Sequence, residues 1–132
     1  MPVRAEPGAA RLLVVDDDPG VRELLEEFLV RCGYQVGTSS DGAEAIRAIT
    51  AKAPDVVLLD IDMPKLRGVD ALPAIRGIAP ETKVIMVSGT TDEVTAKRAL
   101  AYGAFDYVTK PINLSRLARA IEAALTMKEL GA

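Results

Sequence analysis

Four groups of polar residues have the types and spacing needed for phosphoryl chemistry. Asp16-Asp17-Asp18, Asp60, Ser88 and Lys110 each follow directly after a short apolar run. Carboxylates that converge repel one another unless a cation lies between them. A hard divalent cation such as Mg²⁺ prefers oxygen ligands, and its open coordination positions attract a phosphoryl group. We therefore predict a magnesium and phosphoryl site, with Asp60 as acceptor and with Ser88 and Lys110 contacting phosphoryl oxygens.

Strands must bring these residues together, and five short runs predict them. Uninterrupted Val, Leu and Ile residues are typical of strands buried on both faces of a parallel sheet. The second run is more polar, which favours an edge position. The predicted strands are Leu12–Val15, Tyr34–Thr38, Asp55–Leu59, Val84–Val87 and Phe105–Thr109.

Helical patterns separate the strands. The first lies between Asp18, an expected N-cap, and Gly33, an expected stop. In the third we expect Pro73 near the first turn, because proline lacks the N–H that an interior position requires. The other predicted helices run from about Asp41 to Lys52, Gly68 to Ile78, Asp92 to Tyr102 and Asn113 to Leu130.

Alternating strands and helices predict an α/β fold with a doubly wound parallel sheet, covered by helices on both faces. Ligands of such sheets bind beyond the carboxyl ends of the strands. The predicted strands end near residues 16, 38, 60, 88 and 110. The polar residues named above therefore meet at the edge where a ligand is expected.

Composition excludes several classes of protein. The 132 residues suit one domain, and their net charge is −3. The chain has no histidine and a single cysteine, Cys32, so a Cys/His zinc site, an internal disulfide and a Ser-His-Asp triad are excluded. We expect Cys32 to be a small buried apolar residue. The mild acidity argues against direct nucleic-acid binding, which normally needs a basic patch.

The location is expected to be cytoplasmic. No apolar run reaches the length of a membrane span, and the first residues lack the apolar segment of a secretory signal. Residues 1–10 contain two prolines and a glycine and are predicted to be a disordered leader. We expect no effector domain after residue 130.

Four motifs, VVDDDP, DVVLLDIDMP, VIMVSG and DYVTKP, occur in an order and spacing that resemble the receiver domain of two-component response regulators. The resemblance covers about Arg11 to Leu130. It implies a five-stranded flavodoxin-like (βα)5 sandwich with strand order 2-1-3-4-5. It also implies a signalling switch that phosphorylates and dephosphorylates itself with Mg²⁺, without being a turnover enzyme.

The resemblance assigns roles to the site. Asp60 would accept a phosphoryl group from a histidine of a sensor kinase or phosphotransfer protein, which must be another molecule. Asp17 and Asp60 would bind Mg²⁺ by carboxylate, Asp16 mainly through water, and Asp62 through its backbone carbonyl. Lys110 would pair with the acceptor and then with the phosphate.

Ser88 and Tyr107 occupy the family's switch positions, and the Lys110–Pro111 bond is expected to be cis. The switch would act on the surface of the fourth helix, fifth strand and fifth helix, where a homodimer could form. Asp62 and Thr90 lie where the family varies and should tune phosphate hydrolysis.

Alternatives remain open at this point. Asp16–Asp18 could be a turn and a helix cap, and Tyr107 could be a structural strand residue. Asp60-Ile61-Asp62 also matches the D-x-D of haloacid-dehalogenase-like Mg²⁺ phosphohydrolases, although Met63-Pro64 follows where that family has Gly-Thr or Gly-Val. A flavodoxin-like mononucleotide binder is a third hypothesis, but three aspartates after the first strand would repel a phosphate.

Overall fold

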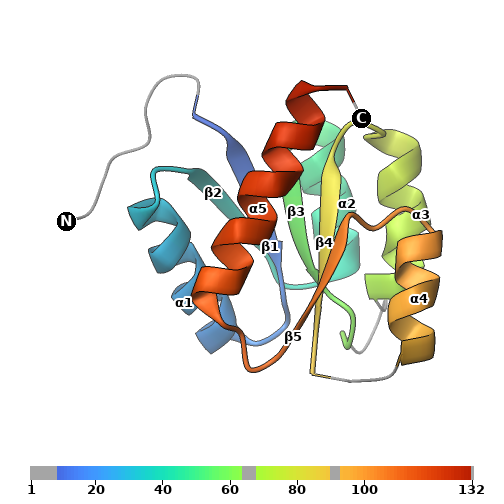
Figure 1. Ribbon diagram of the computed structural model, residues 1–132, viewed down its shortest axis with the longest axis horizontal. Helices are drawn as coiled ribbons and strands as arrows, with labels where there is room; N and C mark the ends of the chain where they lie inside the picture. Colours follow the sequence, from blue (N-terminus) through green and yellow to red (C-terminus); the bar gives the residue numbers. More distant parts are fainter. Residues whose placement is uncertain (1–8, 64–67, 90–92, 132) are drawn as a thin grey trace.

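The computed structural model describes residues 9–63, 68–89 and 93–131, in which strands and helices alternate (Figure 1). The strands are β1 (Arg11–Val15), β2 (Gln35–Ser39), β3 (Val56–Asp60), β4 (Lys83–Ser88) and β5 (Asp106–Thr109). The helices are α1 (Pro19–Arg31), α2 (Gly42–Ala51), α3 (Gly68–Ile78), α4 (Glu93–Ala101) and α5 (Leu114–Glu129).

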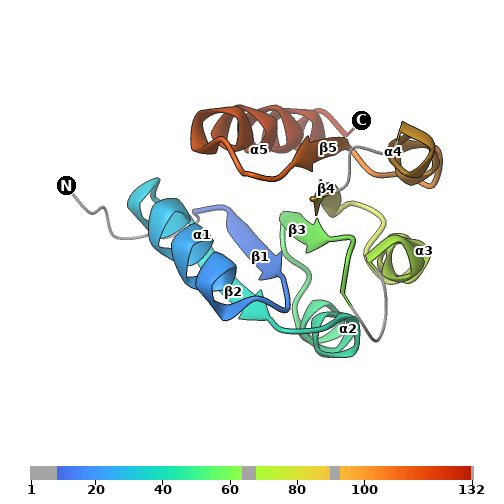
Figure 2. The same cartoon turned by 90° about the horizontal axis from the view of Figure 1, so that it is seen from below.

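All strand pairs are parallel, and the sheet order is β2-β1-β3-β4-β5. This order confirms the expected fold class and the edge position of the polar β2. The central β3 is buried along its whole length, in agreement with its uninterrupted apolar sequence. The carboxyl ends of the strands share the lower edge of the sheet in Figure 1 and face the viewer in Figure 2.

Helices cover both faces of the sheet, and each face has its own core (Figure 2). One core contains Leu25 and Leu29 of α1 with Leu117 and Ile121 of α5. The other contains buried residues of α2, α3 and α4, including Ile49, Ile75 and Ala99. Burying apolar surface stabilises a fold by about 25 cal/mol per Å². Burial on both faces of the sheet therefore holds these short elements together.

Side-chain caps start three of the helices where the sequence predicts. Asp18 accepts hydrogen bonds from the N–H groups of Gly20 and Val21, and α1 begins after it. Asp41 and Asn113 cap α2 and α5 in the same way.

Pro73 does not lie near the first turn of α3, as the sequence analysis expected; it lies inside the helix. An interior proline removes one helical hydrogen bond and costs about 3 kcal/mol in an isolated helix. Here Leu72 and Ile75 are fully buried in the core, while Pro73 faces solvent. Tertiary burial therefore outweighs the local preference.

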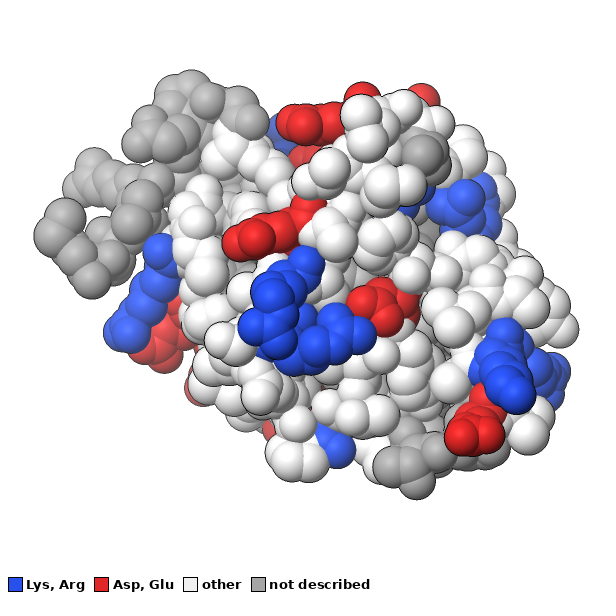
Figure 3. Space-filling model, viewed as in Figure 1, with Lys and Arg blue, Asp and Glu red and all other residues white. Residues whose placement is uncertain are grey.

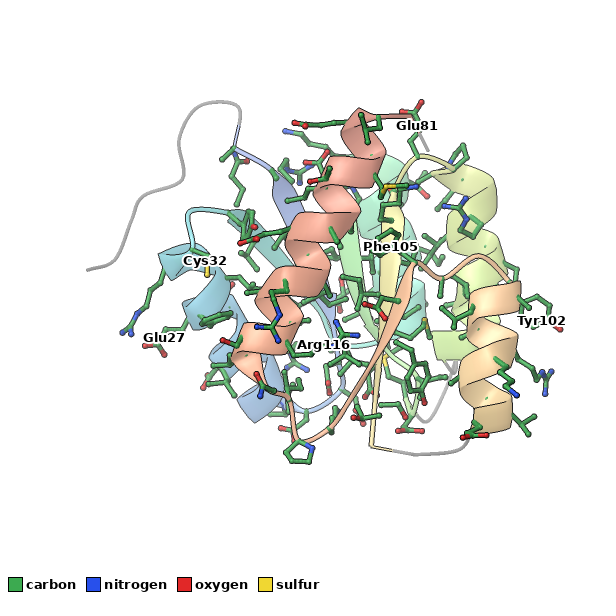
Figure 4. The ribbon with its side chains drawn as sticks, in the orientation of Figure 1. Glu27, Cys32, Glu81, Tyr102, Phe105 and Arg116 are labelled. Atoms are coloured by element: carbon green, nitrogen blue, oxygen red, sulfur yellow. The ribbon has the colours of Figure 1, made fainter. Side chains whose placement is uncertain are left out.

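The expectation that Cys32 is buried was wrong, because its side chain is exposed. Cys32 caps the C-terminus of α1, and its N–H bonds to the carbonyls of Phe28 and Leu29. Gly33 then takes a left-handed conformation with φ of 98° and ends the helix. The turn carries Cys32 to the outside of the molecule, as Figure 4 shows.

The predicted leader, residues 1–10, lies outside the described residues except for positions 9 and 10. None of the helices in the described part of the chain has the length and hydropathy needed to cross a bilayer.

Candidate functional site at the carboxyl edge of the sheet

Backbone hydrogen bonds hold the predicted site residues at the carboxyl edge. The N–H of Asp16 donates to the carbonyl of Ser39 at 3.2 Å, one residue beyond β1. The N–H of Lys110 donates to the carbonyl of Ser88 at 2.7 Å, one residue beyond β5. Asp60, the last residue of β3, pairs in register with Val87 of β4. The ladder thus positions all four strand ends as the sequence analysis predicted.

Three carboxylates converge there. Asp16, Asp17 and Asp60 each place a carboxylate oxygen within 4.8 Å of the others. Asp16 and Asp60 are buried, whereas Asp17 is exposed. Burial raises the pKa of Asp60 to about 6; the N–H of Asp62 opposes this rise, and the negative charge of Asp16 adds to it. An all-oxygen set of this kind fits a hard divalent cation, which would relieve the repulsion.

Lys110 supplies a cation to this cluster. Its Nζ lies 3.1 Å from Oδ2 of Asp16 and 3.7 Å from Oδ2 of Asp60. Burial works to lower the pKa of Lys110, but the hydrogen bond to Asp16 and the charge of Asp60 outweigh it and raise that pKa. Lys110 is therefore an ammonium ion shared by two carboxylates, and it lies closer to Asp16 than to the predicted acceptor. The Lys110–Pro111 bond is cis, as expected.

Asp16 is fixed from several sides. Its Oδ1 accepts a hydrogen bond from the N–H of Asp18 at 2.9 Å. Its backbone carbonyl accepts one from Nη1 of Arg22 at 2.7 Å. Asp18 is thus both the cap of α1 and part of the loop that orients Asp16. Sequence reasoning did not identify Arg22, which lies on α1 and has no distinguishing motif.

Ser88 is fully buried at the end of β4, and its hydroxyl donates to Oδ2 of Asp62 at 2.9 Å. The N–H of Gly89 donates to the same oxygen at 3.3 Å. The sequence analysis gave Asp62 a metal-binding role through its backbone carbonyl and an influence on phosphate hydrolysis, but it did not predict this side-chain contact. The D-x-D spacing was the available signal, but it does not show where the second carboxylate points.

Asp62 also contacts the acceptor directly, because its N–H donates to Oδ1 of Asp60 at 3.0 Å. Tyr107 lies on β5 opposite Met86 and packs, partly buried, against the core that contains α2, α3 and α4. Its place beside α4 is compatible with either a switch or a structural role. Thr90 lies outside the described residues.

Comparisons with known proteins agree with this fold and site. The family model described as the response regulator receiver domain matches residues 12–122. The chain is 42% identical over 116 residues to the transcriptional regulatory protein KdpE of Mycobacterium tuberculosis, covering 86% of this chain and 50% of that protein. It is 35% identical over 112 residues to the chemotaxis protein CheY of Thermotoga maritima, covering 84% of this chain and 93% of that protein.

Solved structures give the same result. A CheY-like receiver domain protein from Methanospirillum hungatei superposes with a TM-score of 0.90 at 28% identity, covering 94% of this chain and 99% of that one. The receiver domain of NtrX from Brucella abortus gives a TM-score of 0.82 at 37% identity, covering 87% and 98%. The chain therefore belongs to the receiver domain family of two-component response regulators. The haloacid-dehalogenase alternative finds no support.

The chain spans only part of the first curated relatives that it matches. It covers 24% of the DNA-binding transcriptional regulator NtrC of Azospirillum brasilense, and half of KdpE. Receiver domains of this family are signalling switches that interact with histidine kinases.

Proposed function

We propose that Asp60 is the phosphoacceptor of this receiver domain. The observation that carries the proposal is the position of its buried carboxylate between the acidic cluster of Asp16 and Asp17 and the ammonium of Lys110. An oxygen of Asp60 would bond to phosphorus as the P–N bond of a phosphohistidine breaks, and the electron pair would leave with the imidazole nitrogen. These 132 residues contain no histidine, so the donor lies outside them, on a sensor kinase or phosphotransfer protein.

The chain's own residues would prepare this transfer. Asp16, Asp17, Asp60 and the backbone carbonyl of Asp62 would hold Mg²⁺, which supplies charge neutralisation for an incoming phosphoryl group. Lys110 would compensate the charge of the acyl phosphate. The pKa of Asp60 is about 6, so most of its side chains are carboxylates at neutral pH.

Ser88 and Tyr107 would relay phosphorylation to the α4–β5–α5 surface. Ser88 ends β4, and Tyr107 lies on the neighbouring β5. An ion pair of 3.0 Å between Arg116 and Asp106 joins α5 to β5. Tyr102, at the end of α4, points outward and is half exposed (Figure 4). Three exposed apolar side chains, Val94, Leu100 and Tyr102, lie on α4 or directly after it. Sedimentation with and without beryllofluoride would test for a homodimer formed through this surface; an unchanged mass would contradict dimerisation on activation.

The proposal describes a switch and not a turnover enzyme. It includes no direct contact with nucleic acid, since the net charge is −3 and such binding normally needs a basic patch. On the one face that Figure 3 shows, acidic side chains lie near the basic ones. A cytoplasmic location and the domain limits 11–130 are part of the same proposal.

Acetyl phosphate with Mg²⁺ provides the test. We expect one phosphoryl label per chain, and Asp60→Asn should abolish it. Asp55→Asn is a matched control, because Asp55 precedes the same strand at the opposite edge of the sheet and should leave labelling intact. A label that survives Asp60→Asn would mean that the acceptor is another residue. Rapid multiple turnover of a generic phosphate ester would contradict the switch.

A further inference from the structure

Two hydrogen-bond donors converge on one carboxylate oxygen beside the acceptor. The hydroxyl of Ser88 and the N–H of Gly89 both donate to Oδ2 of Asp62, at 2.9 and 3.3 Å. Paired donors aimed at one point form a site for an anionic oxygen. In this structure the protein's own carboxylate occupies that site.

The pair of donors adjoins Asp60. Asp60 and Val87 are register partners on β3 and β4, so Ser88 ends the neighbouring strand one residue later and Gly89 follows it. Asp62 is two residues beyond Asp60, and its N–H already bonds to the acceptor carboxylate. Ser88 is fully buried while Asp62 is exposed. The contact therefore ties an exposed loop to a buried hydroxyl next to the reacting group.

We infer that Asp62 is a latch that holds Ser88 and Gly89 in the unphosphorylated arrangement and must release them when Asp60 is phosphorylated. The inference rests on the proposed function of Asp60. A serine hydroxyl has one proton to donate, so Oδ2 of Asp62 and a phosphoryl oxygen compete for it. Asp62 acts through Ser88 and is a positioning residue.

The expected size follows from the type of bond. Hydrogen bonds to a charged partner change an equilibrium by about 10- to 100-fold. A ligand that needs the released arrangement binds more weakly by the fraction of molecules that are released. Removing the latch should therefore tighten binding of a phosphoryl mimic by about tenfold.

A double-mutant cycle tests the inference. Beryllofluoride affinity in the presence of Mg²⁺ would be measured by calorimetry for the wild type, Asp62→Ala, Ser88→Ala and the double variant. We expect Asp62→Ala to tighten binding about tenfold when Ser88 is present and less than twofold when it is absent. Equal gains in both backgrounds would mean that Asp62 acts only by charge repulsion, and would overturn the latch. No gain, or a loss, with Ser88 present would also overturn it.

A second readout needs neither metal nor phosphoryl mimic. In the Mg²⁺-free protein, the amide proton of Gly89 should shift upfield in the NMR spectrum of Asp62→Ala, because it loses its acceptor. An unchanged Gly89 resonance would overturn the inference, since the contact would then not exist in solution. Acetyl phosphate labelling of the wild type on Asp60 is checked first. Failure there refutes the proposed function, and the latch with it; labelling with a failed cycle refutes the latch alone.

Discussion

The two aspartates at the ends of β3 have opposite environments. Asp55, immediately before the strand, accepts a hydrogen bond from the N–H of Arg11 at 2.8 Å and pairs with Nζ of Lys128 at 3.0 Å. Partial burial works to raise its pKa, but the bond from Arg11 and the contact with Lys128 outweigh burial and lower that pKa. Asp60 ends the same strand, and burial together with the charge of Asp16 raises its pKa to about 6.

The comparison shows at which edge of the sheet each carboxylate has its own hydrogen-bond and ion-pair partners. At the amino edge Asp55 has a backbone donor and a lysine to itself. At the carboxyl edge Lys110 is shared between Asp16 and Asp60, and Asp17 adds a third carboxylate. The net charge of −3 conceals this imbalance, because it is a property of the whole chain. The first arrangement stabilises the fold, and the second stores repulsion that a cation can relieve.

The largest effect is expected at the satisfied edge. Asp55→Ala should lower the free energy of unfolding by about 2–3 kcal/mol at pH 7, because it leaves the donors of Arg11 and Lys128 unpaired. The lowered pKa of Asp55 means that its charge contributes stability above the unfolded value of 3.8. That contribution is lost as the pH falls through the folded pKa. Urea denaturation from pH 7 to pH 3 should show the difference from wild type shrinking; a constant difference would contradict this.

At the other end of β3, replacing the aspartate should change the free energy of unfolding in the opposite direction. Without Mg²⁺, Asp60→Asn should raise the free energy of unfolding by about 1–2 kcal/mol at pH 7, after allowance for water at the rim. Because the pKa of Asp60 is raised on folding, the folded state binds more protons than the unfolded state. The wild type therefore loses stability as the pH rises from about 4 to about 6. The variant should lack this loss. Destabilisation of Asp60→Asn in chelator would contradict the comparison.

Mg²⁺ should narrow the contrast between the edges. At a free Mg²⁺ concentration five times its Kd, the mass-action relation for one site predicts that the ion stabilises the wild type by about 1 kcal/mol. Asp17→Asn removes an exposed ligand of the cluster and should abolish most of this gain. Asp55→Asn should keep the gain in full. Thermal melts with and without Mg²⁺ would measure it, and equal gains in both variants would place the ion elsewhere.

The smallest effect is expected for Lys128→Ala. The pair with Asp55 is only partly buried, so its loss should cost about 0.5 kcal/mol and should diminish in high salt. A salt-independent cost would show that the stem of Lys128 contributes by packing instead.

Much of the site could be predicted because strand ends are visible in sequence. The apolar runs before Asp16, Asp60, Ser88 and Lys110 predict strands, and parallel strands carry their last residues to one edge. The cluster at the carboxyl edge could therefore be predicted without knowing the loop conformations. The contact between Asp62 and Ser88 could not, because the two residues are 26 apart in sequence and the direction of a loop side chain follows no periodic pattern.

The sequence by itself determined the elements, their alternation, the cap Asp18, and the edge at which chemistry is expected. These follow from local patterns of polarity and from hydrogen bonds within a few residues. Only the tertiary structure decided that Lys110 lies closer to Asp16 than to Asp60, and that Asp62 binds Ser88. Distances between charges on different strands depend on how the whole sheet packs, and short-range sequence patterns do not contain that information.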